Sequence, residues 1–502
     1  MSQQPDPARP RPRRATTRSK TPPSNGLQLP EKAPARPASD DREGWKSYWE
    51  ERQQPWRIEP EIDAQRQHEL AACYKVPPDI EKGTYPFRGR KLSRAEIEWL
   101  LVAYKDRFTP EKGLDVRGAD LDGVNLSGLP LIGLHGGLAY NEWEYGSEEQ
   151  RKVAAVHMSN SLLVAAQLQG AHLCEAQLQG ADLREAQLQG ADLREAQLRG
   201  AILREAQLQG AQLNRAQLQT ADLHEAQLQG AFLQEAQLFG AQLQGTHLYE
   251  VQLQGSDLRE AQLQGAQLNR AQLQDAQLND VTLANPRGIG PQLADIRWDG
   301  VNLAVIDWSQ VEMLGNEYSA RQKKDQDSSV KDKELRLNEY WEAVRANRQV
   351  AVALQTQGLN EEAARFAYRA NVLQRKVLWF QMIQPKISLR QWIRKLGAWV
   401  FSHLLNLVAG YGYRPERSFL AYLLVTFGFM GLYLLTSHLT TPHLRWDEAL
   451  VLSLSSFHGR GFFPQTITLG DAYARLAVIE AVLGLFIEIS FIATFTQRFF
   501  GK

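Results

Sequence analysis

The chain has 502 residues, enough for several domains, and its charges balance because Lys plus Arg and Asp plus Glu each number 57. A net charge of zero excludes a general attraction to nucleic acid or to acidic partners. Only Cys73 and Cys174 are present, which excludes a disulfide framework and favours a reducing compartment for the soluble part. The ten histidines show no metal-ligand spacing, and no phosphate loop or nucleophile motif occurs. We therefore expect no metal, no cofactor and no enzymatic activity.

Residues 1–45 are predicted to form a disordered tail rich in proline and arginine. The first 38 residues hold eight Arg or Lys against Asp6 and Glu31, and such a segment buries too little apolar surface to offset its chain entropy. A solvated tail is the simpler interpretation, and a basic arm that touches anionic lipid or nucleic acid is the alternative. The tail has no apolar stretch of the kind found in signal peptides, so we expect no cleavable signal.

A helical N-terminal region, 46–113, is predicted to precede a long repeat domain. Within it a helix is expected over 93–104 with Ser93 as its N-cap, and this helix would cover the open end of the repeats.

The dominant pattern is a period of five. From Leu163 to Leu283 every fifth residue is Leu, and Ala stands two positions before most of these leucines. An α-helix would wind such leucines round every face, and a flat strand would place them alternately on its two sides. A backbone that bends at every repeat brings all of them into one core, so the period predicts a solenoid with polar residues facing water.

The string AQLQG-ADLRE-AQLQG-ADLRE resembles the pentapeptide-repeat family, whose motif is A-(D/N)-L-x-x. The resemblance implies a right-handed quadrilateral β-helix with four pentapeptides per coil. The pattern fits 32 pentapeptides over 156–315, with Gly288 the one small residue at a Leu position, and 32 repeats would make eight coils, about 38 Å long at a spacing of ~4.8 Å. We predict a repeat domain over 114–315, with one more coil at 114–133 and an insertion at 134–155.

A ten-residue period lies within the five-residue one. AQLQG begins at 166, 176 and 186, and after 236 its phase moves to 241, 251 and 261. In a square coil this places Gln ladders on opposite faces and then transfers them to the adjacent pair. Tandem duplication is the plain explanation, and a polar docking surface for a cytoplasmic protein partner is the alternative. Interleaved charges, 14 acidic and 7 basic over 166–285, disfavour DNA mimicry and nucleic acid as a partner.

Two helical regions are predicted after the repeats. Residues 316–387 are expected to form a helical hairpin linker that turns near Gly358, with Asn360 capping the second helix and Glu361 and Glu362 in its first turn. It resembles a tetratricopeptide-like hairpin; structural linkage is the plain interpretation, and a partner-binding groove is the alternative. Residues 388–410 are expected to form an amphipathic helix at a membrane surface. Its apolar side holds Trp392, Ile393, Leu396 and Trp399, and its basic side Arg390, Arg394 and Lys395.

The C-terminal segment, 411–502, is predicted to be a two-helix transmembrane domain. The stretches 419–439 and 476–497 are long and apolar enough to cross ~30 Å of hydrocarbon. Basic residues precede the first stretch and follow the second, so the positive-inside rule places both termini and the repeats in the cytoplasm of a multi-pass cell-membrane protein.

The loop between the two predicted spans contains a short amphipathic helix, Asp447–Phe457, followed by His458, Gly459, Arg460 and Gly461. A half-helix followed by G-x-G is the arrangement of a re-entrant pore loop, and the segment from about 411 resembles the two-transmembrane potassium-channel pore domain. The resemblance implies a tetramer and a glycine hinge at Gly484. The filter departs from the family, because Phe457 to Phe462 stand where potassium channels have T-V-G-Y-G-D, so potassium selectivity is not carried over. Arg460 occupies the position of the filter tyrosine, whose side chain points away from the ion path, and is expected to be structural unless it faces the axis.

Two carboxylates, Glu480 and Glu488, lie in the second predicted span. Charged groups in a membrane are costly and usually mark a water-filled path or a specific pair. For Glu480 a salt bridge to Arg475 or Arg460 is the alternative to a functional role. Glu488 has no obvious partner in the sequence, and a pore-facing role is favoured.

The predicted fold is therefore multidomain: a β-solenoid, an α-helical linker and a two-helix transmembrane domain with a re-entrant loop. The leading hypothesis is a channel-like, ion-conducting homo-oligomer in the lipid bilayer, with a cytoplasmic β-helix as scaffold or sensor. The alternative is a non-conducting membrane anchor whose β-helix surface binds a partner protein.

Overall fold

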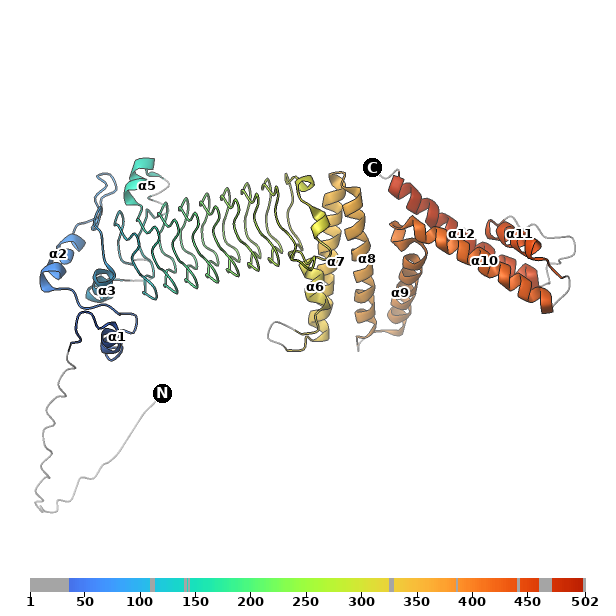
Figure 1. Ribbon diagram of the computed structural model, residues 1–502, viewed down its shortest axis with the longest axis horizontal. Helices are drawn as coiled ribbons and strands as arrows, with labels where there is room; N and C mark the ends of the chain where they lie inside the picture. Colours follow the sequence, from blue (N-terminus) through green and yellow to red (C-terminus); the bar gives the residue numbers. More distant parts are fainter. Residues whose placement is uncertain are drawn as a thin grey trace, which may run out of the picture. The chain divides into compact units, whose positions relative to one another are not determined.

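The computed structural model describes residues 36–108, 113–139, 142, 145–324, 329–384, 387–439, 443–459 and 472–499. The chain divides into two compact units, Met1–Pro60 and Glu61–Lys502. In the larger unit a helical cap, a solenoid, a helical hairpin and a group of apolar helices follow one another along the chain (Figure 1). Most of the predicted tail, residues 1–35, lies outside the described residues.

The smaller unit contains helix α1, Arg42–Glu50. The carboxylate of Asp41 caps it by accepting the backbone N–H of Gly44 at 2.9 Å. Trp45, Tyr48 and Trp49 lie together on this helix, with ring centroids 4.9 to 5.7 Å apart. The helix begins before residue 46, so the predicted tail of 1–45 extends a few residues too far.

The helical cap contains α2 (Ala64–Tyr74), α3 (Arg94–Ala103) and the 3-10 turn η1 (Lys105–Arg107). Ser93 is the N-cap of α3, as predicted: its hydroxyl accepts the N–H of Glu96, and the Glu96 carboxylate accepts the N–H of Ser93. The Arg94 guanidinium donates to the carbonyls of Asn125 and Ser127 in the first coil, at 3.0 Å each. α3 therefore lies against the first coil. Its Arg94 supplies hydrogen bonds to backbone carbonyls for which no preceding coil exists.

The solenoid is a stack of four-sided coils. Parallel backbone bridges join residues 20 positions apart, such as Gln187 with Gln207, so four five-residue sides complete one coil. Within the described part of the solenoid each side contributes an isolated bridge and no longer strand. The leucines from Leu163 to Leu283 are at most 4% exposed. The period of five therefore builds a single internal column of leucines, with alanines beside them.

The corners of the coils depend on left-handed backbone. Every fifth residue from Asn160 to Asp280 has φ between 52° and 71°, whether it is glycine or not. Glycine adopts this conformation without strain, whereas other residues meet a Cβ clash that costs roughly 1–2 kcal/mol. Thr220, with φ of 56°, is β-branched and so least suited to it. The sequence predicted a bend at every repeat but not the left-handed conformation of the corner residues.

The predicted insertion at 134–155 begins too early. His135 pairs in parallel with Asp115 in the coil before it and with His172 in the coil after it, so His135 is itself a side of a coil. The chain leaves the stack after His135 and rejoins it at His157. The coil at 114–133 is therefore continuous with the main stack and not separated from it, because the backbone of His135 pairs on both sides.

Near its C-terminal end the stack takes in one extra five-residue step. Gln267 pairs with Gln292, 25 positions on instead of 20. The extra step contains Gly288, whose φ is +70°, which explains why no leucine stands there. The last turns are the 3-10 segments η2 (Leu303–Val305) and η3 (Trp308–Gln310). The 32 predicted pentapeptides therefore do not all form sides of regular coils.

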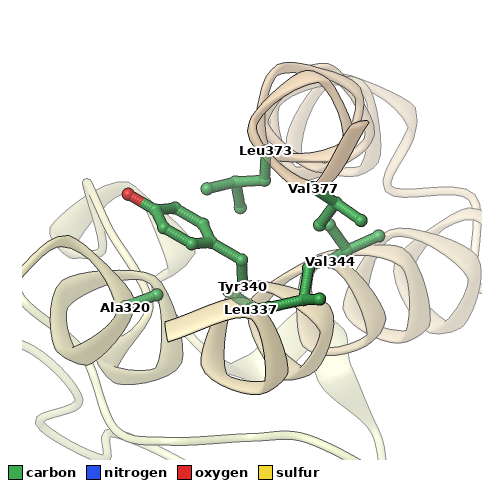
Figure 2. Packing of buried hydrophobic residues seen from close by; sticks show 7 residues of the cluster. Ala320, Leu337, Tyr340, Val344, Leu373 and Val377 are labelled. Carbon is green, nitrogen blue, oxygen red and sulfur yellow. The ribbon is translucent and has the colours of Figure 1, made fainter. Parts of the chain in front are cut away.

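The predicted hairpin consists of α7 (Lys333–Thr356) and α8 (Asn360–Met382), and the short helix α6 (Gly315–Arg321) packs against α7. Apolar side chains of the three helices meet in one cluster, which Figure 2 shows: Ala320, Leu337, Tyr340, Val344, Leu373 and Val377. A glutamine side chain in α7 and one directly after it close the solenoid. Gln349 accepts the N–H of Asp295 at 2.7 Å, and Gln357 accepts the N–H of Leu303 at 2.7 Å.

The turn of the hairpin lies at Gly358, whose φ is +80°. Glu361 and Glu362 lie in the first turn of α8, as predicted. The predicted capping role of Asn360 is wrong. Asn360 is already helical, the N-cap position falls on Leu359, and no side chain caps this end.

The remaining helices are α9 (Leu389–Ala409), the 3-10 turn η4 (Gly410–Gly412), α10 (Pro415–Leu439), α11 (Trp446–Phe457) and α12 (Ala472–Phe499). The hydroxyl of Ser388 caps α9. The two predicted spans, 419–439 and 476–497, lie within α10 and α12. The predicted half-helix is α11.

The strain at the corners leads to a first prediction. Thr220→Gly should raise the free energy of unfolding of the solenoid by about 0.5–1 kcal/mol, because relief of the left-handed strain exceeds the entropy that glycine adds to the unfolded chain. Gly210→Thr should lower it by a similar amount, since an added Cβ at Gly210 would meet nothing within 4 Å and only the backbone would resist. Urea unfolding followed by circular dichroism measures both. Equal effects of the same sign would contradict the role of the corners.

Glu175 leads to a second prediction. It lies near helix α5 (Glu148–Ala154) of the insertion, and burial, with a smaller contribution from the charge of Glu195, raises its pKa from 4.5 to about 7. The folded protein therefore binds this proton more tightly than the unfolded chain, and stability should fall as pH rises from 4.5 to about 7. Glu175→Gln should remove this fall and stabilise the protein by ~1 kcal/mol at pH 8, a figure reduced for partial exposure. Unfolding free energies across this pH range test it, with Glu185→Gln as the control; an unchanged pH profile in Glu175→Gln would contradict it.

Candidate functional site in the apolar helices

Two helices of the C-terminal group are long and apolar enough to cross a membrane. They are Glu416–His438 in α10 and Ala472–Ala493 in α12, with mean hydropathies of 1.9 and 2.3. Many of their large apolar side chains are exposed, among them Phe419, Leu424, Phe427, Val478, Val482 and Ile492. A surface of this kind requires an apolar surrounding or a partner.

The short helix α11 packs against both long helices. Near its beginning, the N–H of Leu444 donates to the hydroxyl of Ser437 at 2.7 Å, close to the end of α10. At its other end Phe457 is buried against Tyr422 in the first half of α10 and Ile487 in the second half of α12. α11 therefore runs back along α10 from the end of that helix toward its beginning.

Glu480 is a buried carboxylate held between the three helices. The hydroxyl of Tyr433 in α10 donates to one carboxylate oxygen at 2.8 Å, and the hydroxyl of Ser453 in α11 donates to the other. Ser453 also lies 2.8 Å from the carbonyl oxygen of Thr426. Both carboxylate oxygens of Glu480 thus accept hydrogen bonds from hydroxyl groups. The salt bridge to Arg475 or Arg460 that the sequence left open stays a prediction. Glu480 thus joins α12 to α10 and α11.

Glu488 has a partner that the sequence did not suggest. Its carboxylate contacts Nδ1 of His458, the residue that follows α11. The two side chains are 36% and 43% exposed, whereas Glu480 is fully buried. The expectation that Glu488 has no partner is therefore wrong, because α11 folds back and brings its C-terminal end to α12. The pair nevertheless remains open to the surroundings.

Two glycines of the predicted site lie in different surroundings, one in a turn and one at a contact between helices. Gly459 follows α11 with φ of +68° and its N–H donates to the carbonyl of Ser456. Gly484 is buried where α12 touches α11, and an added Cβ would overlap the carbonyl oxygen of Phe457. Gly484 thus permits close helix contact, while its predicted role as a hinge stays a prediction. Arg460 and Gly461 lie outside the described residues.

Sequence reasoning missed Tyr433 and Ser453, the partners of Glu480. The only signal that the sequence carries for them is that α10 and α11 contain several hydroxyl side chains. The sequence does not tell which of these hydroxyls faces the carboxylate. The site that the structure brings together therefore consists of Glu480 with Tyr433 and Ser453, and of Glu488 with His458. No group of three or more metal-ligating side chains is found among the residues that the structure describes.

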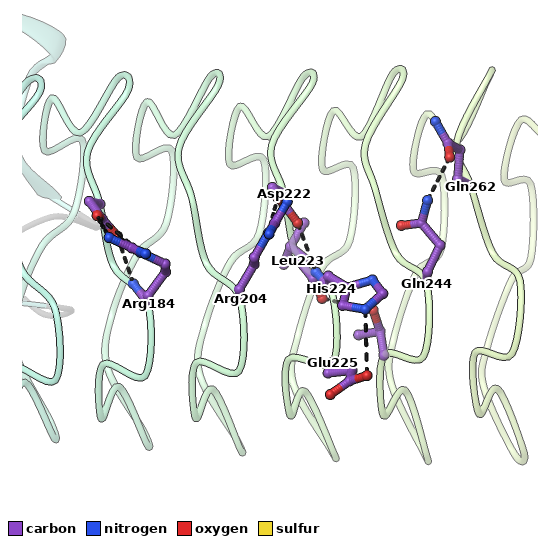
Figure 3. A network of polar contacts seen from close by, with 10 residues as sticks. Arg184, Arg204, Asp222, Leu223, His224, Glu225, Gln244 and Gln262 are labelled. Carbon is purple, nitrogen blue, oxygen red and sulfur yellow. Dashed lines mark hydrogen bonds and ion pairs between the residues drawn. The ribbon is translucent and has the colours of Figure 1, made fainter.

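The outer surface of the solenoid carries a second set of ordered polar contacts. Glutamines donate amide hydrogen bonds from coil to coil, as between Gln209 and Gln227 at 2.6 Å and, in Figure 3, between Gln244 and Gln262 at 2.5 Å. The glutamines of the AQLQG units occupy opposite faces of the coil up to residue 237 and the other two faces from 242 to 272, as the ten-residue period predicted, while Gln267 and Gln277 remain on the first two faces. Figure 3 also shows Arg204 reaching Asp222 in the next coil. These contacts make a regular and rigid polar surface.

The fold and the site thus define a solenoid of five-residue units followed by a helical hairpin and a pair of apolar helices that enclose a short third helix. The model of the pentapeptide-repeat family matches this solenoid in overlapping stretches that run from residue 161 to residue 285. Pentapeptide repeats of this segment are therefore established. Proteins of this kind are generally structural or interaction proteins and not enzymes. No curated protein matches the sequence.

Three solved structures illustrate what the solenoid is similar to. A pentapeptide repeat protein from the thylakoid lumen of Arabidopsis thaliana is 23% identical, covering 26% of this chain and 85% of its own, with a TM-score of 0.20. HetL, a pentapeptide repeat protein involved in heterocyst differentiation regulation from the cyanobacterium Nostoc sp. strain PCC 7120, is 24% identical, covering 42% of this chain and 98% of its own, with a TM-score of 0.17. QnrB1, a plasmid-mediated fluoroquinolone resistance protein, is 19% identical, covering 40% and 90%, with a TM-score of 0.19.

The close contact at Gly484 leads to a third prediction. Gly484→Ala should lower the thermal unfolding midpoint of the protein in detergent by several degrees, because the new Cβ forces α12 away from α11 at a cost of about 1–3 kcal/mol. Gly428→Ala in α10 is the matched control, since its Cβ would meet nothing within 4 Å. Alanine also favours helix in both variants, so their difference isolates the contact. Identical midpoints for the two variants would show that α11 does not pack here.

Proposed function

We propose that the chain is a multi-pass membrane protein in which α10, α11 and α12 form the subunit of an ion-conducting homo-oligomer, with the pentapeptide-repeat solenoid as a cytoplasmic scaffold or sensor. The observation that carries this proposal is the course of α11. A loop between two spans that only connected them would stay outside the bilayer, whereas α11 packs along both helices as far as Phe457, beside Gly484 near the middle of α12.

The depth of the ends of α11 supports a re-entrant course. α12 begins at Ala472, and Tyr473 packs against Tyr433 near the end of α10. His458, by contrast, contacts Glu488, which lies less than one helical turn beyond the middle of α12. α11 therefore begins beside the C-terminal end of α10, and the chain reaches Glu488 of α12 at His458. It then returns to the C-terminal end of α10, where α12 begins. Pore loops of two-span channels have this connectivity.

The His458–Glu488 pair is the best candidate for contact with ions. A partly exposed carboxylate within an apolar helix is costly in lipid, so it is expected to face water or another subunit. The backbone after α11 turns at Gly459, which adopts a left-handed conformation and, being glycine, has no side chain next to the pair. In a tetramer, as the resemblance to potassium-channel pores implies, four such pairs would surround one axis. The predicted filter lacks the potassium signature, so the proposal names no selective ion.

A non-conducting scaffold is the second candidate, and the outer surface of the solenoid favours it. The Gln ladders present a rigid polar face, and a hollow of 610 Å³ lies between the last coil and α7, lined in part by Trp298, Arg348 and Val352. Val352 is 60% exposed there, which would suit a docked partner. In this case α10 and α12 would serve as a membrane anchor only.

Ion flux distinguishes the two candidates and forms a fourth prediction. The wild-type oligomer in liposomes should pass cations, and Glu488→Gln should reduce the flux about tenfold, which corresponds to losing ~1.4 kcal/mol of local attraction for a cation. Glu361→Gln, an exposed carboxylate in α8, is the control and should leave the flux unchanged. Fluorescent ion indicators inside the liposomes measure both.

One outcome would overturn the channel proposal, and a second would overturn only the role of the His458–Glu488 pair in it. A correctly assembled wild-type oligomer that passes no ions under any condition would leave the scaffold as the function. Equal flux through Glu488→Gln and wild type would remove the His458–Glu488 pair from the ion path.

A further inference from the structure

Positive charge is concentrated around α9. The segment 375–417 contains eight Arg or Lys and a single acidic residue, Glu416, although the whole chain is neutral. Within α9 itself there is no acidic residue, and Arg390, Arg394 and Lys395 lie in its first two turns. A solvated surface helix would normally carry charges of both signs, so this segment is suited to an anionic partner.

The apolar side of α9 is uncovered along most of its length. A stripe at helical spacing is formed by Leu389, Ile393, Leu396, Val400, Leu404 and Leu407. Leu389 and Leu407, at its two ends, are 73% and 72% exposed, and only Val408 and Ala409 of the helix are buried. Apolar surface of this extent is unfavourable in water, so the stripe requires a cover.

The basic residues flank this stripe. On a helix of 3.6 residues per turn, Arg390 and Arg394 fall to one side of the stripe and Lys395 to the other. Their long aliphatic stems can follow the apolar surface while the charged ends reach outward. This arrangement matches a helix that lies in the plane of a membrane surface, with its stripe in the acyl chains and its cations among the headgroups.

The C-terminal end of α9 is fixed to the beginning of α10. The Arg417 guanidinium donates to the carbonyl of Asn406 at 3.0 Å, and the Ser418 hydroxyl donates to the carbonyl of Val408 at 3.0 Å. The chain turns between the two helices at Gly410, whose φ is +52°. α9 is therefore held at the level where the first apolar helix begins, which favours a bilayer surface as its cover over a separate protein.

We infer that α9 is a binding site for anionic phospholipid, in which Arg390, Arg394 and Lys395 hold the phosphate-bearing headgroups and the apolar stripe enters the acyl chains. The inference rests on the proposed membrane location of α10 and α12, but not on ion conduction. Each basic residue near an anionic surface adds to the attraction, so three of them should produce a preference of at least tenfold over neutral lipid.

The test is lipid competition on the full-length protein. The delipidated protein in neutral detergent is titrated with phosphatidylglycerol and with phosphatidylcholine, and bound lipid is counted by native mass spectrometry. Wild type should prefer phosphatidylglycerol at least tenfold, and the triple variant R390Q/R394Q/K395Q should lose this preference. The control variant R199Q/R287Q/K323Q removes the same charge from exposed positions outside α9 and should behave as wild type.

Several results would overturn the inference. They are an absent preference in wild type, an unchanged preference in the α9 variant, and an equal loss in the control variant. Binding of an acidic protein that is lost in R390Q/R394Q/K395Q, together with no lipid preference in wild type, would assign α9 to a protein partner instead. Alkaline extraction of native membranes tests the spanning helices separately: release of the wild-type protein would contradict the membrane proposal, whereas a retained protein without lipid preference would contradict only the role of α9.

Discussion

The pairing of each coil with the next is the interaction on which the rest of the molecule depends. A five-residue side buries one leucine and one small residue, far too little to fold alone, and its backbone groups find partners only in neighbouring coils. The stack therefore needs a cover at each end. Arg94 of α3 supplies it at the first coil, and Gln349 of α7 with Gln357, which follows α7, supplies it at the last. The helical cap and the hairpin are thus conditions for the solenoid to exist.

Much of this fold could be predicted because its signals are local. A leucine at every fifth position excludes helix and strand within a few repeats, and Ser93 and Glu96 lie close enough in sequence to read as a cap. The exceptions have physical reasons. The left-handed corners are shared by Gly and Glu alike, so residue type does not reveal them. His135 belongs to the stack only because its backbone pairs with distant coils, and Gly288 marks an inserted step that the unbroken register conceals.

The candidate site was predicted less completely because its contacts join residues that lie far apart in the sequence. Glu480 and Glu488 stand out in an apolar helix, but their partners come from α10 and α11 across long stretches of chain. Tyr433 and Ser453 are ordinary residues in their own helices, and their hydroxyls become informative only when α11 packs against α12. His458 illustrates the limit most clearly: it was selected as part of a loop motif, and its contact with Glu488 depends on the close approach that Gly484 permits.

The solenoid, α9 and the three C-terminal helices differ in the polar and apolar groups that they present. The solenoid presents an ordered polar surface, and α9 is a basic and apolar helix that precedes the two long apolar helices. The three C-terminal helices hold one buried carboxylate, Glu480, and one partly exposed carboxylate, Glu488. The central claim is that these three helices are one subunit of a pore. Native mass spectrometry of the full-length protein released from membrane mimetics into detergent tests it most directly. A mass of four chains is predicted, and a monomer in every detergent that preserves the fold would contradict the claim.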